Sequence, residues 1–397
     1  MIETPAPSCQ VVIAGGGIGG LATALALARK RIPSLVLERR DGFKDDGAGI
    51  QIGPNGTRIL AALGAASFIE KRATSPDVLR IRDAATAREL ACFPLGPWIA
   101  ARHGAPYWAA HRRDLHAALL AAAGRDPLVR LKTGNGVAGA TENADRVAVT
   151  MMDGTTVECR ALIAADGAWS RLRTDVFGAV RPSYTGKSAV RTVIPVSNVP
   201  DELSANEVNL WLGPNVHVVH YPVSAGEAVA VVAIFDDGRI AGDWNTPCNR
   251  NWVAGRTQTF TPLLKNFLAQ PDTWRRWSLL ALAKPPKLAV GRMALLGDAA
   301  HPILPFLAQG GVMALEDAMT VADALSAHAG DPSRAFASYA KARAARVRRV
   351  ATASRMNGRI YHFGGIMARA RNAAFERIPP EHFMRRYDWI YGWRHVS

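Results

Sequence analysis

The sequence has no hydrophobic run that approaches the roughly 20 residues a membrane-spanning helix needs. Its first residues, MIETPAPSCQVVIAGGG, lack a basic segment, and their apolar run is too short for a signal peptide. Cysteine is scarce and no CxxC spacing occurs, which argues against a disulfide framework and against a metal site. The cysteines are Cys9, Cys92, Cys159 and Cys248. We therefore expect a cytoplasmic protein that binds no metal and no membrane.

Acidic residues are outnumbered, because 48 Lys and Arg stand against 33 Asp and Glu and give a formal net charge of +15. The strongest basic cluster, KARAARVRRVATASR at residues 341–355, falls on a predicted helix and is interpreted as a solvated helix face. Aromatic residues do not alternate with these basic residues, as a nucleic-acid stacking surface would need. No nucleic-acid partner is expected, and the charge instead favours attraction of small anions and coenzymes.

The opening of the chain has the pattern of a βαβ unit. Residues 10–14, QVVIA, predict a buried strand, and GGGIGG leads into an Ala- and Leu-rich helix that ends near Lys30. A second buried strand, SLVLE, follows at residues 34–38. Two buried strands joined by a helix within about 30 residues predict a parallel, doubly wound sheet.

The glycine-rich turn carries a dinucleotide-binding fingerprint. Gly15, Gly17 and Gly20 fill GxGxxG between the strand and the helix, with Ile18 and Gly19 inside the motif. Small residues there permit a tight turn and a close approach of the backbone to a pyrophosphate, whose charge the helix N-terminus stabilises. Glu38 follows about 20 residues later, where an acid can accept hydrogen bonds from ribose hydroxyls.

A second segment far along the chain distinguishes FAD from NAD. FAD extends well beyond one βαβ unit and needs contacts from a distant segment, and LLGDAAHPILPFLAQGGVMALEDA at residues 295–318 supplies them. Asp298 ends a predicted strand, where it can accept hydrogen bonds from ribityl hydroxyls or act as a turn acid. Gly310 and Gly311 begin a predicted helix whose positive end would face the flavin. His301 is interpreted as a structural histidine of the turn or as a site residue.

Three segments together resemble one family. GGGIGG, ALIAADGAWSRLR and GRMALLGDAAHPILPFLAQGGVMALEDA are similar to the fingerprint, DG motif and GD motif of single-component FAD-dependent aromatic hydroxylases with the p-hydroxybenzoate hydroxylase fold. The wording of the third segment resembles the branch of salicylate hydroxylase, 3-hydroxybenzoate 6-hydroxylase and 6-hydroxynicotinate 3-monooxygenase. The tail YDWIYGW also looks like that branch. The resemblance covers residues 10 to about 325 and implies a bound FAD, with NADH or NADPH and O2 as co-substrates.

The resemblance also implies roles for individual residues. Gln51 should lie on the loop that faces the flavin, and Gly311 and Val312 should offer backbone N–H groups to the flavin O2. Asp166 and Arg171 of the DG motif are similar to residues that contact FAD and the nicotinamide coenzyme, or that hold the loop. The remaining FAD contacts implied are Gly15, Gly17, Gly20, Glu38, Arg39, Arg112 and Asp298.

The predicted fold is α/β, with a Rossmann-type FAD-binding domain, an inserted mainly antiparallel β-sheet substrate domain and a C-terminal helical segment. Residues 1–78, 102–181 and 286–330 are assigned to the FAD-binding domain. Residues 79–101 and 182–285, rich in strand-like runs such as SAVRTVIPV and AVAVVAIF, are assigned to the substrate domain. Residues 331–397 form the C-terminal region, expected to be helical to about Phe375. Short strands TTVECR and ALIAA are expected as separate elements.

The segment NVHVVHYPV, residues 215–223, is the candidate for the substrate side of the site. Strand alternation places His217, Val219 and Tyr221 on one face and His220 on the other. The resemblance implies that a His and a Tyr at the positions of His217 and Tyr221 line the pocket. It also implies that the His acts as a base toward a substrate phenol, a role that a histidine can fill near neutral pH. His220 remains an alternative base.

Pro305 separates two substrate assignments within the branch. The resemblance implies a Gln at this pocket position in 3-hydroxybenzoate 6-hydroxylase and a Pro in salicylate hydroxylase-like sequences, so Pro305 favours ortho-hydroxylation or decarboxylative hydroxylation. The expected function is hydroxylation of a small aromatic acid or phenol through a flavin C4a-hydroperoxide, by a monomer or homodimer. The alternatives are the same chemistry on a non-aromatic or larger scaffold, and a basic nucleic-acid-binding protein with structural FAD.

Overall fold

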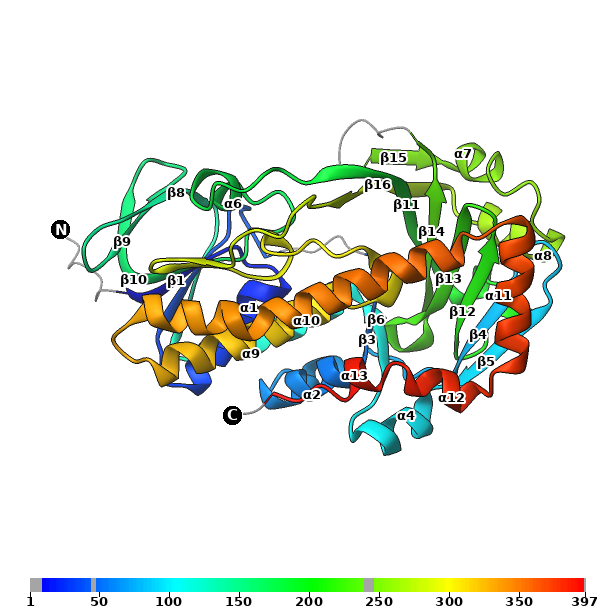
Figure 1. Cartoon of the computed structure of the whole chain (residues 1–397), viewed down its shortest axis with the longest axis horizontal. Helices are drawn as coiled ribbons and strands as arrows, with labels where there is room; N and C mark the ends of the chain where they lie inside the picture. Colours follow the sequence, from blue (N-terminus) through cyan, green and yellow to red (C-terminus); the bar gives the residue numbers. More distant parts are fainter. Residues whose placement is uncertain (1–8, 44–47, 239–245, 396–397) are drawn as a thin grey trace.

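The computed structural model describes residues 9–43, 48–238 and 246–395 (Figure 1). Residues 1–8 lie outside the described residues. They begin the segment in which no signal peptide is predicted. None of the described helices is both long and apolar enough to cross a bilayer. Among the described residues, no group of three or more His, Cys, Asp or Glu side chains is placed to hold a metal ion.

The first sheet is parallel at its centre, as the opening βαβ pattern predicts. Strand β1 (Cys9–Ala14) lies between β2 (Ser34–Leu37) and β10 (Thr156–Ala164), and pairs in parallel with both. The predicted strands TTVECR and ALIAA form the single strand β10, because the chain crosses from the pair with β9 to the pair with β1 without a break. The other strands of this sheet are β7 (Val129–Lys132), β8 (Val137–Glu142), β9 (Val147–Met151), β17 (Ala289–Val290) and β18 (Met293–Leu295).

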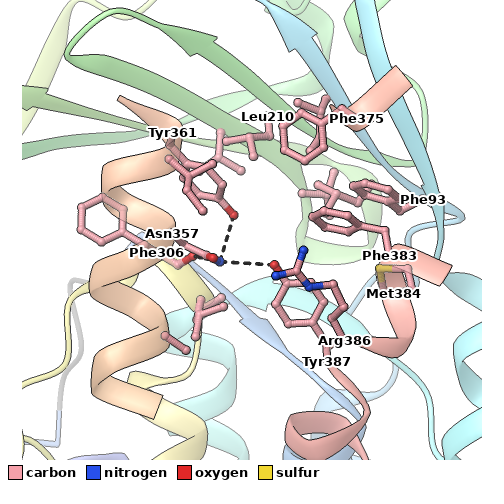
Figure 2. A pocket seen from close by; sticks show the side chains of 18 of the residues that line it. Phe93, Leu210, Phe306, Asn357, Tyr361, Phe375, Phe383, Met384, Arg386 and Tyr387 are labelled. Atoms are coloured by element: carbon pink, nitrogen blue, oxygen red, sulfur yellow. Dashed lines mark hydrogen bonds between the residues drawn. The ribbon is translucent and has the colours of Figure 1, made fainter. Parts of the chain in front are cut away.

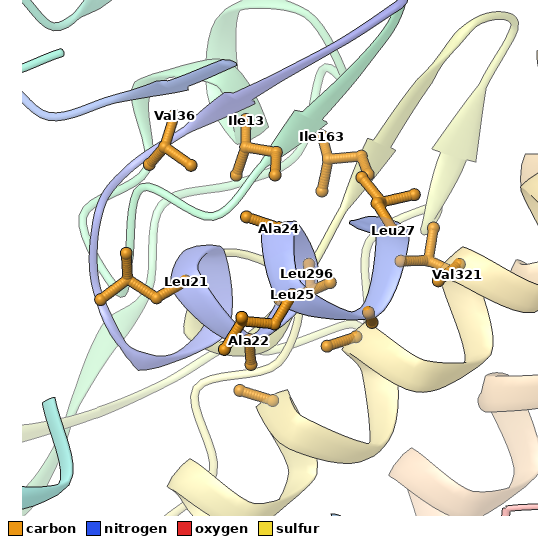
Figure 3. Packing of buried hydrophobic residues seen from close by; sticks show 14 of the residues in the cluster. Ile13, Leu21, Ala22, Ala24, Leu25, Leu27, Val36, Ile163, Leu296 and Val321 are labelled. Atoms are coloured by element: carbon orange, nitrogen blue, oxygen red, sulfur yellow. The ribbon is translucent and has the colours of Figure 1, made fainter. Parts of the chain in front are cut away.

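Helix α1 (Ile18–Arg29) is buried along most of its length between this sheet and helix α9 (Gly310–Ala327). Figure 3 shows α1 between the strands that carry Ile13, Val36 and Ile163 and the helix that carries Val321. An Ala- and Leu-rich helix suits this position, since small side chains allow close approach on both sides. The neighbouring helices are α2 (Pro54–Ala62), α3 (Ala66–Ile69), α4 (Gly96–His103), α5 (Arg112–Ala123) and α6 (Arg171–Asp175).

The second sheet is mainly antiparallel, and its strands run in the order β15-β16-β11-β14-β13-β12-β4-β5. The elements of this part are β4 (Val78–Asp83), β5 (Glu89–Pro94), β11 (Ser183–Pro195), β12 (Glu207–Gly213), β13 (Val216–Val223), β14 (Ala228–Asp236), β15 (Thr246–Asn249), β16 (Thr273–Ala281), α7 (Arg250–Ala254) and α8 (Pro262–Ala269). The α/β fold class with an antiparallel second sheet is confirmed, while the domain boundaries drawn from the sequence stay a prediction. A small ribbon, β3 (Gly49–Ile52) with β6 (Trp108–His111), lies between the two sheets (Figure 1).

The C-terminal helices connect the two halves of the molecule. Helix α10 (Pro332–Tyr361) runs from beside α9 to the second sheet (Figure 1). The expected helix to Phe375 is interrupted at residues 362–364, and α11 (Gly365–Arg377), α12 (Pro380–Arg385) and α13 (Asp388–Tyr391) lead the chain back toward α2. The interruption turns the chain over the end of the second sheet.

Candidate functional site

The glycine-rich turn leaves open space at one position and no space at two others. A Cβ at Gly20 would collide with the carbonyl oxygen of Gly15, and a Cβ at Gly15 would collide with that of Ala165. Gly15 also has φ +112°, a backbone conformation that favours glycine. A Cβ at Gly17, by contrast, would meet nothing within 4 Å. The space in front of Gly17, at the N-terminus of α1, can therefore receive a pyrophosphate.

The two remote segments that carry the fingerprint and the GD motif meet in the fold. A Cβ at Gly19 would lie 2.8 Å from Leu296 Cδ2 and 3.3 Å from Ala314 Cβ. Gly297, which has φ +61°, approaches the same Ala314. The start of α1, the turn after β18 and the first turns of α9 therefore share one packed corner.

Glu38 is tied to the glycine turn by its own carboxylate. Its Oε2 accepts a hydrogen bond from the Gly16 N–H at 2.9 Å, and its Oε1 accepts one from the Arg40 N–H at 3.1 Å. Burial raises the pKa of Glu38, but these hydrogen bonds outweigh burial and hold it below its ordinary value. Arg39, beside it, is exposed. The carboxylate thus stays charged and orients the turn on which a nucleotide would rest.

The other predicted cofactor residues surround the same region. Asp298 is exposed in a short 3-10 turn whose carbonyl accepts a hydrogen bond from Arg173 at 3.3 Å. Asp166 follows the end of β10 by two residues and accepts a hydrogen bond from the Arg171 N–H at 3.1 Å, which holds the DG loop. Arg112 begins α5, and its N–H donates to the Ala48 carbonyl at 2.9 Å.

Gln51, which the sequence placed on a loop, lies instead on strand β3, and this strand brings it to the N-terminus of α9. A Cβ at Gly311 would lie 2.8 Å from Ile50 Cδ1, while one at Gly310 would meet nothing within 4 Å. Val312 is buried. Gln51 accepts a hydrogen bond at 2.5 Å from the Tyr107 hydroxyl on its amide oxygen. The positive end of an 18-residue helix and the loop predicted to face the flavin are therefore neighbours.

His301 takes part in a buried charge network behind this site. Its Nε2 lies 2.6 Å from Asp317 Oδ2, and Asp317 also accepts hydrogen bonds from the Gly297 N–H at 3.0 Å and from Arg343 Nε at 2.6 Å. Burial lowers the pKa of His301, but the Asp317 carboxylate outweighs burial and raises it. Arg343 also pairs with Glu316 at 3.0 Å. His301 thus holds the GD turn against α9 and α10.

The interpretation of residues 341–355 as a solvated helix face is wrong for part of the cluster. Arg343 is 1% exposed, and Arg346 donates to Glu316 at 2.7 Å and 3.0 Å. Arg348 and Arg349 are exposed, as predicted. The prediction was wrong because the sequence does not show that α9, which carries Glu316 and Asp317, packs against this part of α10.

A cavity of about 470 Å³ opens between the second sheet and the C-terminal helices. His217 and Pro305 line it, whereas Tyr221 is not among the lining residues. Tyr221 is buried next to Gly49 and has a hydrogen bond with the Gln51 side chain, and burial raises the pKa of its hydroxyl to about 12. Gln51 lines the cavity as well, so the cavity reaches the loop predicted to face the flavin.

His217 and His220 lie on opposite faces of β13. His217 is 3% exposed, and its ring lies 5.5 Å from the ring of Phe306 and 5.3 Å from that of Tyr361. Burial lowers its pKa well below the ordinary value. His220 accepts a hydrogen bond from Trp211 Nε1 at 3.1 Å, and burial lowers its pKa to about 3. Only His217 of the two candidate bases faces the cavity.

The sequence reasoning missed the part of the cavity wall that the C-terminal segment supplies. Figure 2 shows Asn357 directed toward the Tyr361 and Tyr387 hydroxyls, at 3.3 Å and 3.4 Å. The Arg386 guanidinium lies close to Tyr387 in the same view. The aromatic tail YDWIYGW was the available signal, but a pattern of aromatic residues does not reveal which cavity they line.

The comparisons with known proteins agree on one family. A family model described as FAD binding domain matches residues 8–354. The chain is 36% identical to 3-hydroxybenzoate 6-hydroxylase of Klebsiella oxytoca, over 97% of each chain. It is 31% identical to 6-hydroxynicotinate 3-monooxygenase of Bordetella bronchiseptica, over 88% of this chain and 91% of that one. The chain belongs to the FAD-dependent aromatic hydroxylases.

This flavoprotein monooxygenase also shares its fold with a solved salicylate hydroxylase in complex with substrate. The TM-score is 0.82 at 26% identity, over 98% of this chain and 96% of that one. The residues of the flavoprotein fit FAD, because the open space at Gly17 and Gly310 lies at two helix N-termini that packing through Gly19 and Ala314 brings together. The predicted family, fold class and FAD cofactor are confirmed.

Replacing Gly17 by valine in the flavoprotein is expected to abolish FAD retention while leaving the fold intact. Its φ of −78° is open to any residue, and the added side chain would fill the space in front of the turn. Flavin absorbance per protein after gel filtration measures the loss. Circular dichroism should match that of the parent, and a variant that purifies fully yellow would contradict the assignment of this space to the cofactor.

Proposed function

We propose that the enzyme uses NADH or NADPH and O2 to hydroxylate a small aromatic acid that carries a phenolic or hydroxypyridine hydroxyl. Its relatives at 36% and 31% identity bear the names of enzymes for 3-hydroxybenzoate and 6-hydroxynicotinate. Both molecules combine one ring, one carboxylate and one ionisable hydroxyl. Whole-chain similarity thus gives more weight to the 3-hydroxybenzoate type than Pro305 alone suggests.

The observation that carries this proposal is the chemistry of the cavity wall. Aromatic and aliphatic side chains dominate it, two arginines contribute to it, and no Asp or Glu of the described chain lines it. Arg371 donates to the carbonyls of Ile360 and Tyr361 at 3.2 Å and 3.1 Å. Arg386 has no ion pair within the described residues and is the candidate partner of a substrate carboxylate.

The chain's own residues would hold the cofactor and prepare the substrate. When bound, FAD supplies the redox chemistry that activates O2. His217 would accept the phenolic proton, because an electron-rich phenolate reacts with an electrophilic oxygen far more readily than a phenol. Tyr221, through Gln51, would position the loop at the flavin, and Pro305 would close the cavity beside it. The proposed cofactor contacts are Gly15, Gly17, Ile18, Gly19, Gly20, Glu38, Arg39, Gln51, Arg112, Asp166, Asp298, Gly310, Gly311 and Val312.

A substrate panel with two arginine variants tests the proposal. Oxidation of NADH and NADPH is followed with 3-hydroxybenzoate, salicylate, 6-hydroxynicotinate and neutral phenol, and products are identified by mass. At least one acid should stimulate oxidation and gain one oxygen. Arg386→Met should weaken binding of that acid by roughly 10-fold or more, the value of one charge-assisted hydrogen bond, with little effect on phenol.

Arg385→Met is the matched control, since Arg385 is exposed and is not among the cavity residues. It should leave the affinity for acids unchanged. Stimulation by bulky neutral compounds and by none of the acids would contradict the proposed substrate class. Equal effects of the two variants would remove the role of Arg386 while leaving the reaction class standing.

A further inference from the structure

The second sheet places a histidine, a carboxylate and an ammonium group on one face. His217 of β13 lies opposite Ile234 of β14, and Lys187 of β11 lies opposite Asp236. Residues directly opposite each other, and residues two apart on one strand, share a face of a sheet. Lys187 and Asp236 form an ion pair there. This face is the one from which His217 enters the cavity wall.

His362 connects His217 to that ion pair. It lies in the break between α10 and α11, where its carbonyl accepts a hydrogen bond from the Asn215 N–H at 3.2 Å. Its Nε2 is 2.8 Å from His217 Nδ1, and its Nδ1 is 3.1 Å from Asp236 Oδ1. Two imidazoles and a carboxylate thus form a continuous row of hydrogen bonds.

The row leads from the buried cavity to solvent. His217 is 3% and His362 is 6% exposed, whereas 33% of the Asp236 side chain is exposed. The other charged or titratable groups that face the row are Lys187, at 3.3 Å from His362 Nδ1, Arg371 and the Tyr361 hydroxyl. None of these three can accept a proton near neutral pH, since two are cations and burial raises the pKa of Tyr361 well above its ordinary value. Asp236 is therefore the outlet.

A lone histidine at this place would be a poor base. Burial lowers the pKa of His217, and the nearby His362 and Lys187 lower it further, so a proton kept on His217 would be lost back to the substrate. A base can work in such surroundings if each proton that it accepts at one nitrogen is matched by one that it gives up at the other. His217 then never carries a net charge.

We propose that His217, His362 and Asp236 form a proton relay that carries the phenolic proton of the substrate from the cavity to solvent. The substrate O–H bond breaks as its proton moves to His217 Nε2, and the Nδ1 proton of His217 passes to His362 Nε2. The Nδ1 proton of His362 passes to Asp236, which releases it to water. Return of a proton to the product hydroxyl before release restores both imidazole tautomers. The relay rests on the proposed function, and His362 and Asp236 act through His217.

Proton release on ligand binding tests the relay without turnover. The FAD-loaded enzyme is mixed rapidly with 3-hydroxy-4-nitrobenzoate, whose phenolate is coloured, in weak buffer with a pH indicator dye. In the wild type, phenolate formation and proton release should share one fast phase. His362→Gln and Asp236→Asn should each slow both signals by about 10- to 100-fold, with ligand affinity within a factor of about three. The variants keep a hydrogen-bonding group at each position but break the row.

His220→Gln is the matched control, because His220 is equally buried on the same strand but points to the other face. It should release protons at the wild-type rate. Undisturbed release in both Asp236→Asn and His362→Gln would overturn the relay alone. If His362→Gln does not fold, wild-type release in Asp236→Asn, a variant at the surface, is sufficient to overturn it. A wild-type enzyme that binds neither this ligand nor any acid of the panel would overturn the proposed function, and the relay with it.

Discussion

Replacing His217 by alanine is expected to lower the rate of substrate hydroxylation by about 100- to 10,000-fold, the usual contribution of a positioned general base. The imidazole is the one candidate base on β13 that lines the cavity, and its Nδ1 already contacts His362. Without it, the phenol would have to react in its protonated and less electron-rich form. The rate of product formation and the amount of product formed per coenzyme oxidised are the measurements.

The alanine variant should keep its FAD and its fold, because the ring contacts of His217 are with Phe306, Tyr361 and His362, none of which is a predicted cofactor residue. Coenzyme oxidation should continue with hydrogen peroxide as its product, so the fraction of oxidation coupled to hydroxylation falls. Full turnover with tight coupling in this variant would show that His217 is not the base.

Replacing Arg343 by methionine is expected to destabilise the protein by about 3–5 kcal/mol, as the loss of one partner from a buried ion pair does. Arg343 is 1% exposed and lies between Glu316 and Asp317, at 3.0 Å and 2.6 Å. Methionine fills a similar volume but leaves the two carboxylates without that charge. Urea unfolding monitored by circular dichroism and by flavin fluorescence measures the effect.

Arg348→Met serves as the control for Arg343→Met, since Arg348 is exposed on the same helix and its replacement should change stability by no more than about 0.5 kcal/mol. Equal stability of the two variants would mean that the network contributes little.

The network also predicts that the stability of the protein depends on pH. Burial raises the pKa of Asp317, but His301 and Arg343 outweigh burial and lower it to about 2. The stabilisation is therefore present above about pH 4 and is lost as the pH falls toward 2.

The flavin half of the molecule could be predicted from sequence because its physics is local. Gly20 is required by the carbonyl of Gly15, five residues earlier, Gly15 has a positive φ, and the apolar strands around them read as buried. The meeting of Gly19 with Leu296 and Ala314 required an additional inference, namely that FAD is too long for one βαβ unit. That inference used the size of the cofactor, so it could connect two segments that are far apart in the sequence.

The cavity wall and the residues of the proposed relay were harder to predict because they depend on long-range placement. The glycine pair Gly364-Gly365 does signal a break in the helix near His362, but nothing in the sequence shows that this histidine approaches His217, 145 positions earlier. Arg343 shows the same difficulty, since a basic residue on a helix is buried only where a facing helix supplies acids. Strand alternation did separate His217 from His220, as a period of two allows.

The separate origin of the two halves of the site has a consequence for how such enzymes diversify. The residues proposed to hold FAD lie before the start of α10, whereas much of the cavity wall comes from the stretch between Ala353 and Tyr391. A chimaera that receives this stretch from a relative could acquire a different ring preference while its oxidising machinery stays as it was. Substrate choice and oxygen chemistry can then evolve as independent modules of a single polypeptide.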